Sequence, residues 1–101
     1  MLDLEQLKNL SDEQRQRYMR AEQVFETDGW KDIEDWAERQ AEAQGLRQLN
    51  AAKWEDALVS RGARAAFMLV AQLKKTTEAE YAVFAEQNAE QATVADEAEH
   101  E

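Results

Sequence analysis

The chain has 101 residues, no cysteine, no proline and a formal net charge of −10 at pH 7. That length suits one small domain, and the lack of cysteine excludes disulfides and thiolate metal sites. Helix-forming residues dominate, and the three glycines are too few for the turns of a sheet. We therefore expect an all-α protein: an antiparallel helical hairpin with additional short N-terminal and C-terminal helices.

The charges are unevenly distributed along the chain. Residues 76–101 carry eight acidic and no basic side chains, whereas residues 1–75 carry the other 14 acidic and all 12 basic ones. We expect residues 1–85 to form the helical domain, and residues 86–101, rich in Ala, Glu and Gln, to form an acidic tail that is flexible and frays. A nearly neutral body disfavours direct binding of nucleic acid, which requires a basic surface.

Residues 65–71 and the N-terminus indicate in which cellular compartment the protein is expected. The longest apolar run, residues 65–71, is too short to cross a bilayer, so we expect no membrane contact. The N-terminus lacks the basic and apolar regions of a secretory signal, which favours assembly in a cytoplasm.

The first half of the chain predicts two short helices. Leu4 and Leu7 have the spacing of one helical face, and Ser11 with Gln14 matches a capping box, so a second helix should begin at Asp12. We expect this helix to end at residues 27–29, with Gly29 adopting a positive φ. Its apolar stripe comprises Tyr18, Ala21, Val24 and Phe25.

Two longer helices should follow and pack as an antiparallel hairpin. The third helix is expected to begin at Trp30 with Asp28 as its cap, and to break at Asn50 and Ala51. Its apolar positions are predicted to share one face: Trp30, Ile33, Trp36, Ala37, Ala43, Leu46 and Leu49. The fourth helix carries a regular stripe, in which the small Gly62 and Ala65 would let another helix approach: Trp54, Leu58, Gly62, Ala65, Leu69 and Leu73.

Residues 65–71 are apolar on every side of the fourth helix. Such a segment needs cover on more than one side, either from the second and fifth helices or from another chain. Lys74 and Lys75 suit a helix C-terminus, and Thr77 to Glu80 match another capping box. We therefore expect a fifth helix from about residue 77, with Tyr81, Phe84 and Ala85 on one face.

No catalytic, metal or cofactor site is predicted. His100, the single histidine, lies in the expected tail without supporting ligands. The acidic residues around positions 28–38 are explained by helix capping and the helix dipole. No nucleophile with a nearby base and no phosphate-binding loop is present, so the chain is not expected to be an enzyme.

Five residues are candidates for contacting a partner: Trp36, Arg61, Arg64, Phe67 and Met68. Arg61 and Arg64 are one helical turn apart, and two interpretations stay open for them. They form ion pairs with Glu38 or Glu42 on the third helix, or they anchor an interface, where arginine is frequent. Trp36 is expected to be partly exposed, with Trp30 and Trp54 in the core.

The residues Gly29-Trp30, Ile33, Trp36, Asn50-Ala51, Trp54 and Arg61-Gly62, followed by the apolar run up to Leu73, resemble small helical-hairpin proteins of tailed bacteriophages. Such proteins tend to be encoded among virion-morphogenesis genes, near the portal and terminase. The resemblance covers about residues 25–75. It implies a virion structural or assembly role in which several symmetric copies, or a homo-oligomer, contact a larger portal, capsid or tail protein.

Two other functions stay open. The net charge and the size also suit a small acidic inhibitor that mimics DNA. An adaptor that binds a host or phage nucleic-acid-processing protein is the other alternative.

Overall fold

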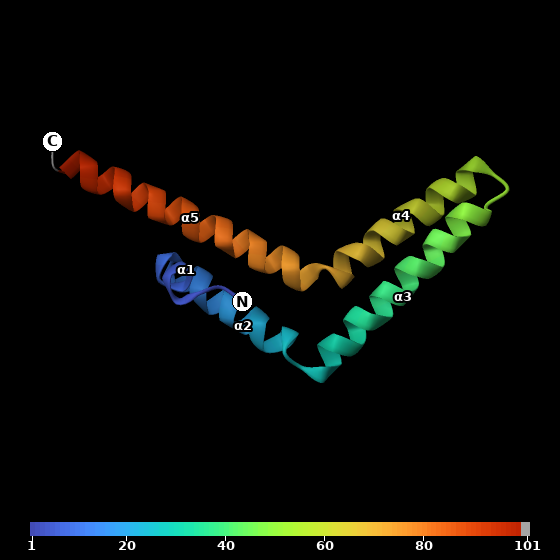
Figure 1. The fold of residues 1–101 in the computed structure, drawn as a ribbon, viewed down its shortest axis with the longest axis horizontal. Coiled ribbons are helices and arrows are strands. Elements are labelled where there is room, and N and C mark those ends of the chain that lie inside the picture. Colours follow the sequence, from blue (N-terminus) through green and yellow to red (C-terminus); the bar gives the residue numbers. More distant parts are fainter. Residues whose placement is uncertain (100–101) are drawn as a thin grey trace. The chain divides into compact units, whose positions relative to one another are not determined.

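The computed structural model describes residues 1–99, with side chains through residue 95. Within them the chain is all-α, as predicted, and has no strand. The helices are α1 (Leu4–Asn9), α2 (Asp12–Phe25), α3 (Asp28–Asn50), α4 (Trp54–Ala71) and α5 (Leu73–Glu99) (Figure 1). They divide into two compact units, which differ from the predicted division at residue 85. One unit joins residues 1–24 to the chain from Lys74 onward, and the other is the hairpin unit, residues 25–73.

Side-chain caps fix where the first two helices begin. The backbone N–H of Gln14 donates to Ser11 Oγ at 3.2 Å, and the N–H of Ser11 donates to Gln14 Oε1 at 3.0 Å, which confirms the predicted capping box. Asp3 and Gln6 form a second box at the start of α1. Each box satisfies backbone donors that a helix start leaves unpaired.

The core of the first unit gathers around Tyr18. In Figure 1, α1 and α2 lie along α5. Tyr18 is fully buried, and its ring centroid lies 5.3 Å from that of Tyr81 on α5. Its hydroxyl accepts a hydrogen bond of 2.9 Å from the backbone N–H of Leu2. The buried members of this core are Leu2, Leu10, Tyr18 and Ala85.

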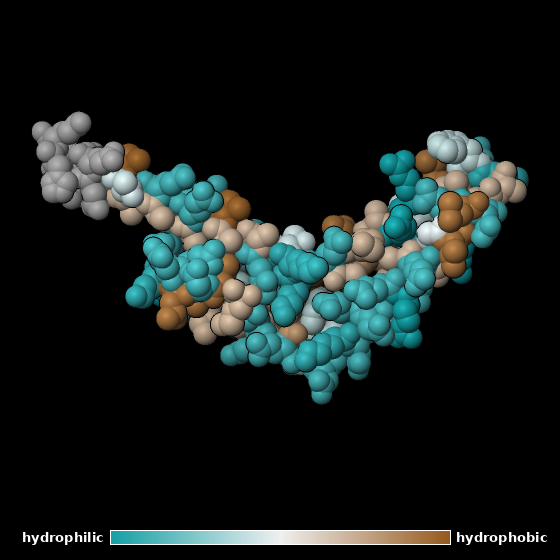
Figure 2. All heavy atoms as spheres, in the orientation of Figure 1, coloured by the Kyte–Doolittle hydropathy of each residue, from teal (hydrophilic) through white to brown (hydrophobic). Residues whose placement is uncertain are grey.

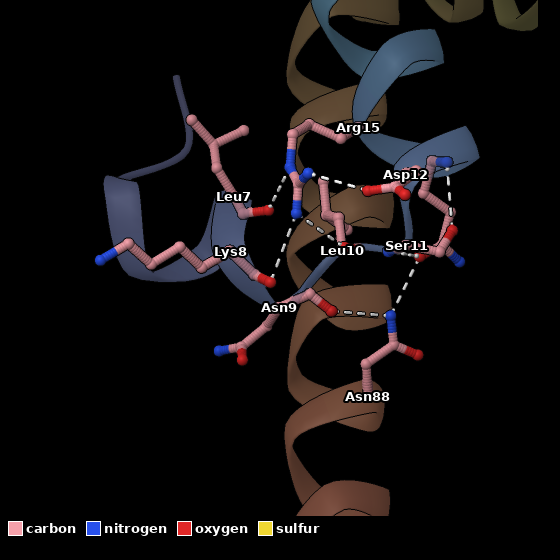
Figure 3. Close-up of polar contacts among 9 residues, drawn as sticks. Leu7, Lys8, Asn9, Leu10, Ser11, Asp12, Arg15 and Asn88 are labelled. Atoms are coloured by element: carbon pink, nitrogen blue, oxygen red, sulfur yellow. Dashed lines mark hydrogen bonds and ion pairs between the residues drawn. The ribbon is translucent and has the colours of Figure 1, made fainter.

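The side chains of Arg15 and Asn88 form hydrogen bonds to the turn between α1 and α2 (Figure 3). The Arg15 guanidinium donates to the carbonyl oxygens of Leu7 at 2.9 Å and Leu10 at 3.1 Å, near the end of α1. Asn88 Nδ2, on α5, donates to the carbonyl oxygen of Asn9 at 2.8 Å and to Gln14 Oε1 at 3.0 Å. These bonds supply donors to the carbonyl groups of Asn9 and Leu10 at the end of α1, and a second donor to that of Leu7, which also accepts from the N–H of Leu10.

The hairpin unit begins with a cap that differs from the predicted one. Thr27, not Asp28, caps α3, because Thr27 Oγ1 accepts from the backbone N–H of Trp30 at 3.1 Å. Gly29 therefore lies inside the first turn of α3 with an ordinary negative φ, and the predicted positive φ is wrong. Trp30 is buried against Phe25, with ring centroids 5.1 Å apart.

The predicted antiparallel hairpin of α3 and α4 is confirmed (Figure 1). α3 ends at Asn50, as expected, and α4 begins after residues 51–53. The rings of Trp36 and Phe67 meet at a centroid distance of 5.5 Å, and farther along α3 Gly45 lies beside the side chain of Arg64. Small side chains are buried in this unit: Ala37 and Ala41 on α3, Ser60 and Ala71 on α4. Small facing residues let two helices pack closely.

α5 differs from its prediction at both ends. It begins at Leu73, only one residue after α4, so Lys74 and Lys75 lie in its first turn and Thr77 is not a cap. The backbone N–H of Gln72 bonds to the carbonyl oxygen of Met68 at 3.0 Å, which closes α4 and lets the chain re-enter a helix at once. The predicted boundary at residue 85 is not a helix end, because α5 continues to Glu99. The flexibility of residues 86–101 stays a prediction, and His100 lies outside the described residues.

Candidate protein-contact surface

α4 leaves three large apolar side chains exposed on the side away from α3, although its Phe67 packs against Trp36 of α3. Trp54 is 72 % exposed, Leu58 44 % and Leu69 70 %, so the prediction that Trp54 lies in the core is wrong. With the exposed Gly62 and Ala65 between them, these residues form what we call the α4 outer stripe. At 100° per residue they lie within one side of the helix, roughly opposite Ser60 and Ala71.

The reason for this reversal lies in the helix that α4 packs against. α3 presents the small buried residues Ala37 and Ala41 toward the hairpin interior. A narrow space between two helices accommodates Ala and Ser but not a row of Trp and Leu. Ser60 and Ala71 of α4 therefore face inward, Phe67 is half-buried beside Trp36, and the α4 outer stripe is left to solvent.

Gly62 leaves the middle of the α4 outer stripe without a side chain. A Cβ atom built on Gly62 would meet nothing within 4 Å. Glycine inside a helix lowers its stability by about 0.5–1 kcal/mol relative to alanine. No close contact within the described chain requires that glycine.

A second exposed apolar region, the Trp36 patch, comprises Ile33, Trp36 and Phe67. Trp36 is 47 % exposed, and its ring meets the half-buried Phe67 edge-on at an interplanar angle of 85°. Ile33 is one turn earlier on α3 and is also exposed. The ring contact holds Trp36 in place while half of its surface stays accessible, which suits an aromatic interface anchor.

The other three candidate residues lie along a different side of α4. Arg61, Arg64 and Met68 follow one helical row, at a spacing of three and four residues. Within the described residues neither arginine forms an ion pair, so the alternative of pairing with Glu38 or Glu42 is wrong. Arg64 instead extends past Gly45, with its Nε 3.5 Å from where a Cβ would stand. The role of all five candidates as partner contacts stays a prediction.

The predicted single apolar face of α3 is also divided. Trp30 and Ala37 are buried, whereas Ile33, Trp36, Leu46 and Leu49 are exposed. In Figure 2, hydrophobic side chains gather on the hairpin near the α3–α4 turn. The exposed large apolar residues of that region are Leu46, Leu49, Trp54, Leu58 and Val59.

In the first unit, a groove of about 340 Å³ lies between α1 and α5. Its lining includes the carboxylates of Asp3, Glu5 and Glu86. Among the residues with described side chains, no group of three His, Cys, Asp or Glu could hold a metal ion. No helix in the described part of the chain is long and apolar enough to span a membrane.

Among the residues with described side chains, Tyr18 has a strongly shifted pKa. Burial, and then the hydrogen bond with Glu22, raises the pKa of Tyr18 from 10.0 to about 12. Glu22 is itself buried, and its Oε1 has no hydrogen-bond partner. Because Tyr18 belongs to a packed core, this shift concerns the stability of the fold.

Comparisons with known protein families, with curated proteins and with solved structures gave no match for this chain.

Proposed function

We propose that this chain is a non-catalytic structural or assembly protein of a tailed bacteriophage, assembled in the host cytoplasm and present in the virion. Its hairpin docks on a larger head or head-to-tail component, such as a portal, capsid or tail protein. The observation that carries the docking proposal is the Trp36 patch, an exposed aromatic side chain held by a ring contact. The phage setting comes from the resemblance over residues 25–75, nearly the same segment as the hairpin unit, residues 25–73.

The surroundings of Trp36 suit a docking contact. Binding energy concentrates in a few aromatic and arginine side chains, which a polar rim shields from water. Asp32, Asp35 and Arg39 are exposed near Trp36 in α3, and Arg39 bonds Asp35 at 3.3 Å. An apolar pocket in the larger protein would cover the indole, while these charges stay at the edge.

The test is capture of phage proteins by a tagged chain in infected cells, scored for head, portal and tail proteins. Trp36→Ala should reduce this capture at least about 10-fold, the usual effect of losing a hot-spot side chain. The matched control is Leu46→Ala, which also truncates an exposed side chain of α3. Ile33→Glu provides a second variant that keeps the Trp36–Phe67 pair, so loss of that ring contact cannot explain a reduced capture by both variants. Unchanged capture by both variants would refute docking through this patch.

A specific observation also favours the acidic inhibitor as a second candidate. A DNA mimic needs carboxylates on a rigid surface, and α5 presents Glu86 and Glu90 one turn apart on one continuous helix. Glu86→Gln with Glu90→Gln should then weaken competition with DNA for a nucleic-acid-processing enzyme. Trp36→Ala should leave that competition unchanged, which separates the two functions.

A further inference from the structure

We propose that the α4 outer stripe binds a second copy of this chain, with the two α4 helices antiparallel around a two-fold axis near residues 63 and 64. This pairing rests on the proposed assembly role, because it would let several copies act together. Its test measures the pairing itself and does not require that role. It uses a different side of the hairpin from the one that carries Trp36.

The order of side chains along the stripe is the first support. Leu58 and Leu69 are equally distant from the midpoint between residues 63 and 64, and so are Gly62 and Ala65. Trp54, at the start of α4, has Leu73 as its counterpart just beyond the helix end. From either end of the α4 outer stripe, large side chains come first, small ones stand in the middle and large ones follow. A face with this symmetry is complementary to itself when two copies meet antiparallel, as an isologous two-fold interface requires.

The small residues lie where such a pair would cross. Gly62 and Ala65 flank the midpoint, and nothing in the described chain lies within 4 Å of a Cβ at Gly62. Two helices approach closely when small residues stand at their contact point. Close approach would bring Leu58 of one copy against Leu69 of the other on both sides of the axis.

The charges of α4 favour the antiparallel over the parallel arrangement. α4 carries two acidic residues, Glu55 and Asp56, and two basic ones, Arg61 and Arg64. Parallel pairing would place the four carboxylates of the two copies together at one end. Antiparallel pairing separates the two acidic turns by roughly 24 Å at 1.5 Å per residue, which is beyond the screening length of about 8–10 Å. The two Arg61 side chains would then lie on the same rim of the contact, on either side of the two-fold axis and about 8 Å apart along the helices.

The exposed area is sufficient for a reversible pair. Trp54 contributes about 150–200 Å², and the exposed Leu58, Leu69 and Leu73 together about 250–350 Å². The two copies would therefore bury roughly 1,000 Å² in total, the lower limit for a specific interface. We expect a dissociation constant in the micromolar range, so that the dimer forms and separates with concentration.

Single cysteines test the register directly, because the chain has none of its own. A mixture of Leu58→Cys and Leu69→Cys chains should form a disulfide between positions 58 and 69 under mild oxidation. Neither variant alone should cross-link, since equivalent positions would be about 16 Å apart along the helices and a disulfide requires Cα atoms within about 7 Å. Equal cross-linking of each variant with itself, or none in the mixture, would overturn the antiparallel pair.

Sedimentation equilibrium of the full chain supplies the second measurement. Gly62→Leu should abolish the concentration-dependent dimer, because a large side chain would block the crossing point. The same change should not unfold the hairpin, since leucine favours helices and nothing inside the chain lies near this position. Gly29→Leu is the matched control, because a Cβ there also meets nothing within 4 Å. A natural chain that stays monomeric at about 500 μM, or a Gly62→Leu chain that dimerises unchanged, would refute the proposal. Capture of phage proteins is scored separately, so the dimer and the docking function fail independently.

Discussion

The side-chain amide of Asn88 donates to the carbonyl oxygen of Asn9 at 2.8 Å, joining residues 79 positions apart in the chain. The same nitrogen donates to Gln14 Oε1 at 3.0 Å, and that oxygen also accepts from the N–H of Ser11. One amide of α5 therefore holds both the end of α1 and the capping box of α2 (Figure 3).

We expect Asn88→Ala to destabilise the first unit by about 1–3 kcal/mol, because it leaves a part-buried carbonyl oxygen without its donor. Urea unfolding followed by circular dichroism measures this change. The neighbouring Gln87→Ala removes an exposed side chain that makes no hydrogen bond within the described residues, and it should change the stability by less than about 0.5 kcal/mol. Equal changes in the free energy of unfolding for the two variants would mean that the hydrogen bonds of Asn88 do not stabilise the first unit.

We expect Arg15 to stabilise the fold through the planar shape of its guanidinium as well as through its charge. It donates to the carbonyl oxygens of Leu7 and Leu10, and it also lies 3.2 Å from Asp12 Oδ1. Arg15→Lys keeps the charge but cannot reach several carbonyls at once, so we expect a loss of about 1–2 kcal/mol in the free energy of unfolding.

Arg17→Lys is the control for that change. Within the described residues Arg17 forms an exposed pair with Glu13, four residues away in α2, and such pairs contribute about 0.3–0.5 kcal/mol. Should Arg15→Lys unfold at the same urea concentration as the natural chain, the carbonyl bonds of Arg15 would not stabilise the end of α1.

The local features of this fold were predictable from the sequence, and the long-range ones were not. The Ser11–Gln14 box depends on residues three apart, so the sequence identifies it directly. The break after Asn50 follows from the same kind of local signal. The bond from Asn88 to Asn9 leaves no such pattern, because it depends on how α5 lies against α1.

The candidate surface was only partly predictable for a related reason. A regular apolar stripe identifies α4 as a helix, but which side faces α3 depends on the space that α3 leaves. Ser60 and Ala71 are buried and Phe67 packs against Trp36, so Trp54 and Leu69 on the other side of α4 are exposed. The sequence did indicate that this helix needs cover from something more than one neighbouring helix.

The raised pKa of Tyr18 predicts how the fold responds to alkaline pH. The folded chain holds the phenolic proton up to about pH 12, whereas an unfolded tyrosine loses it near pH 10.0. This contribution to stability is therefore complete below pH 10 and is lost as the pH rises from 10 to 12. A shift of this size corresponds to roughly 2–3 kcal/mol.

Tyr18→Phe should remove this alkaline loss of stability relative to the natural chain. At neutral pH it should also cost about 1 kcal/mol, because Leu2 loses the acceptor of its N–H. Urea unfolding between pH 8 and pH 12 measures both effects, with Tyr81→Phe as the control that retains Tyr18. An unchanged alkaline decline in Tyr18→Phe would show that other groups cause it.

Gly45 should accept a small side chain and reject a large one, because Arg64 lies over it. A Cβ at Gly45 would meet the Arg64 side chain at 3.5 Å, which is ordinary van der Waals contact. Gly45→Ala should therefore stabilise the hairpin by about 0.5–1 kcal/mol through the helix preference of alanine. Gly45→Leu should destabilise it, because the longer side chain must displace Arg64.

Tryptophan fluorescence reports this unit selectively, since Trp30, Trp36 and Trp54 all lie within residues 25–73. Restored stability on adding Arg64→Ala to Gly45→Leu would identify Arg64 as the obstacle, whereas destabilisation by Gly45→Ala would contradict the contact.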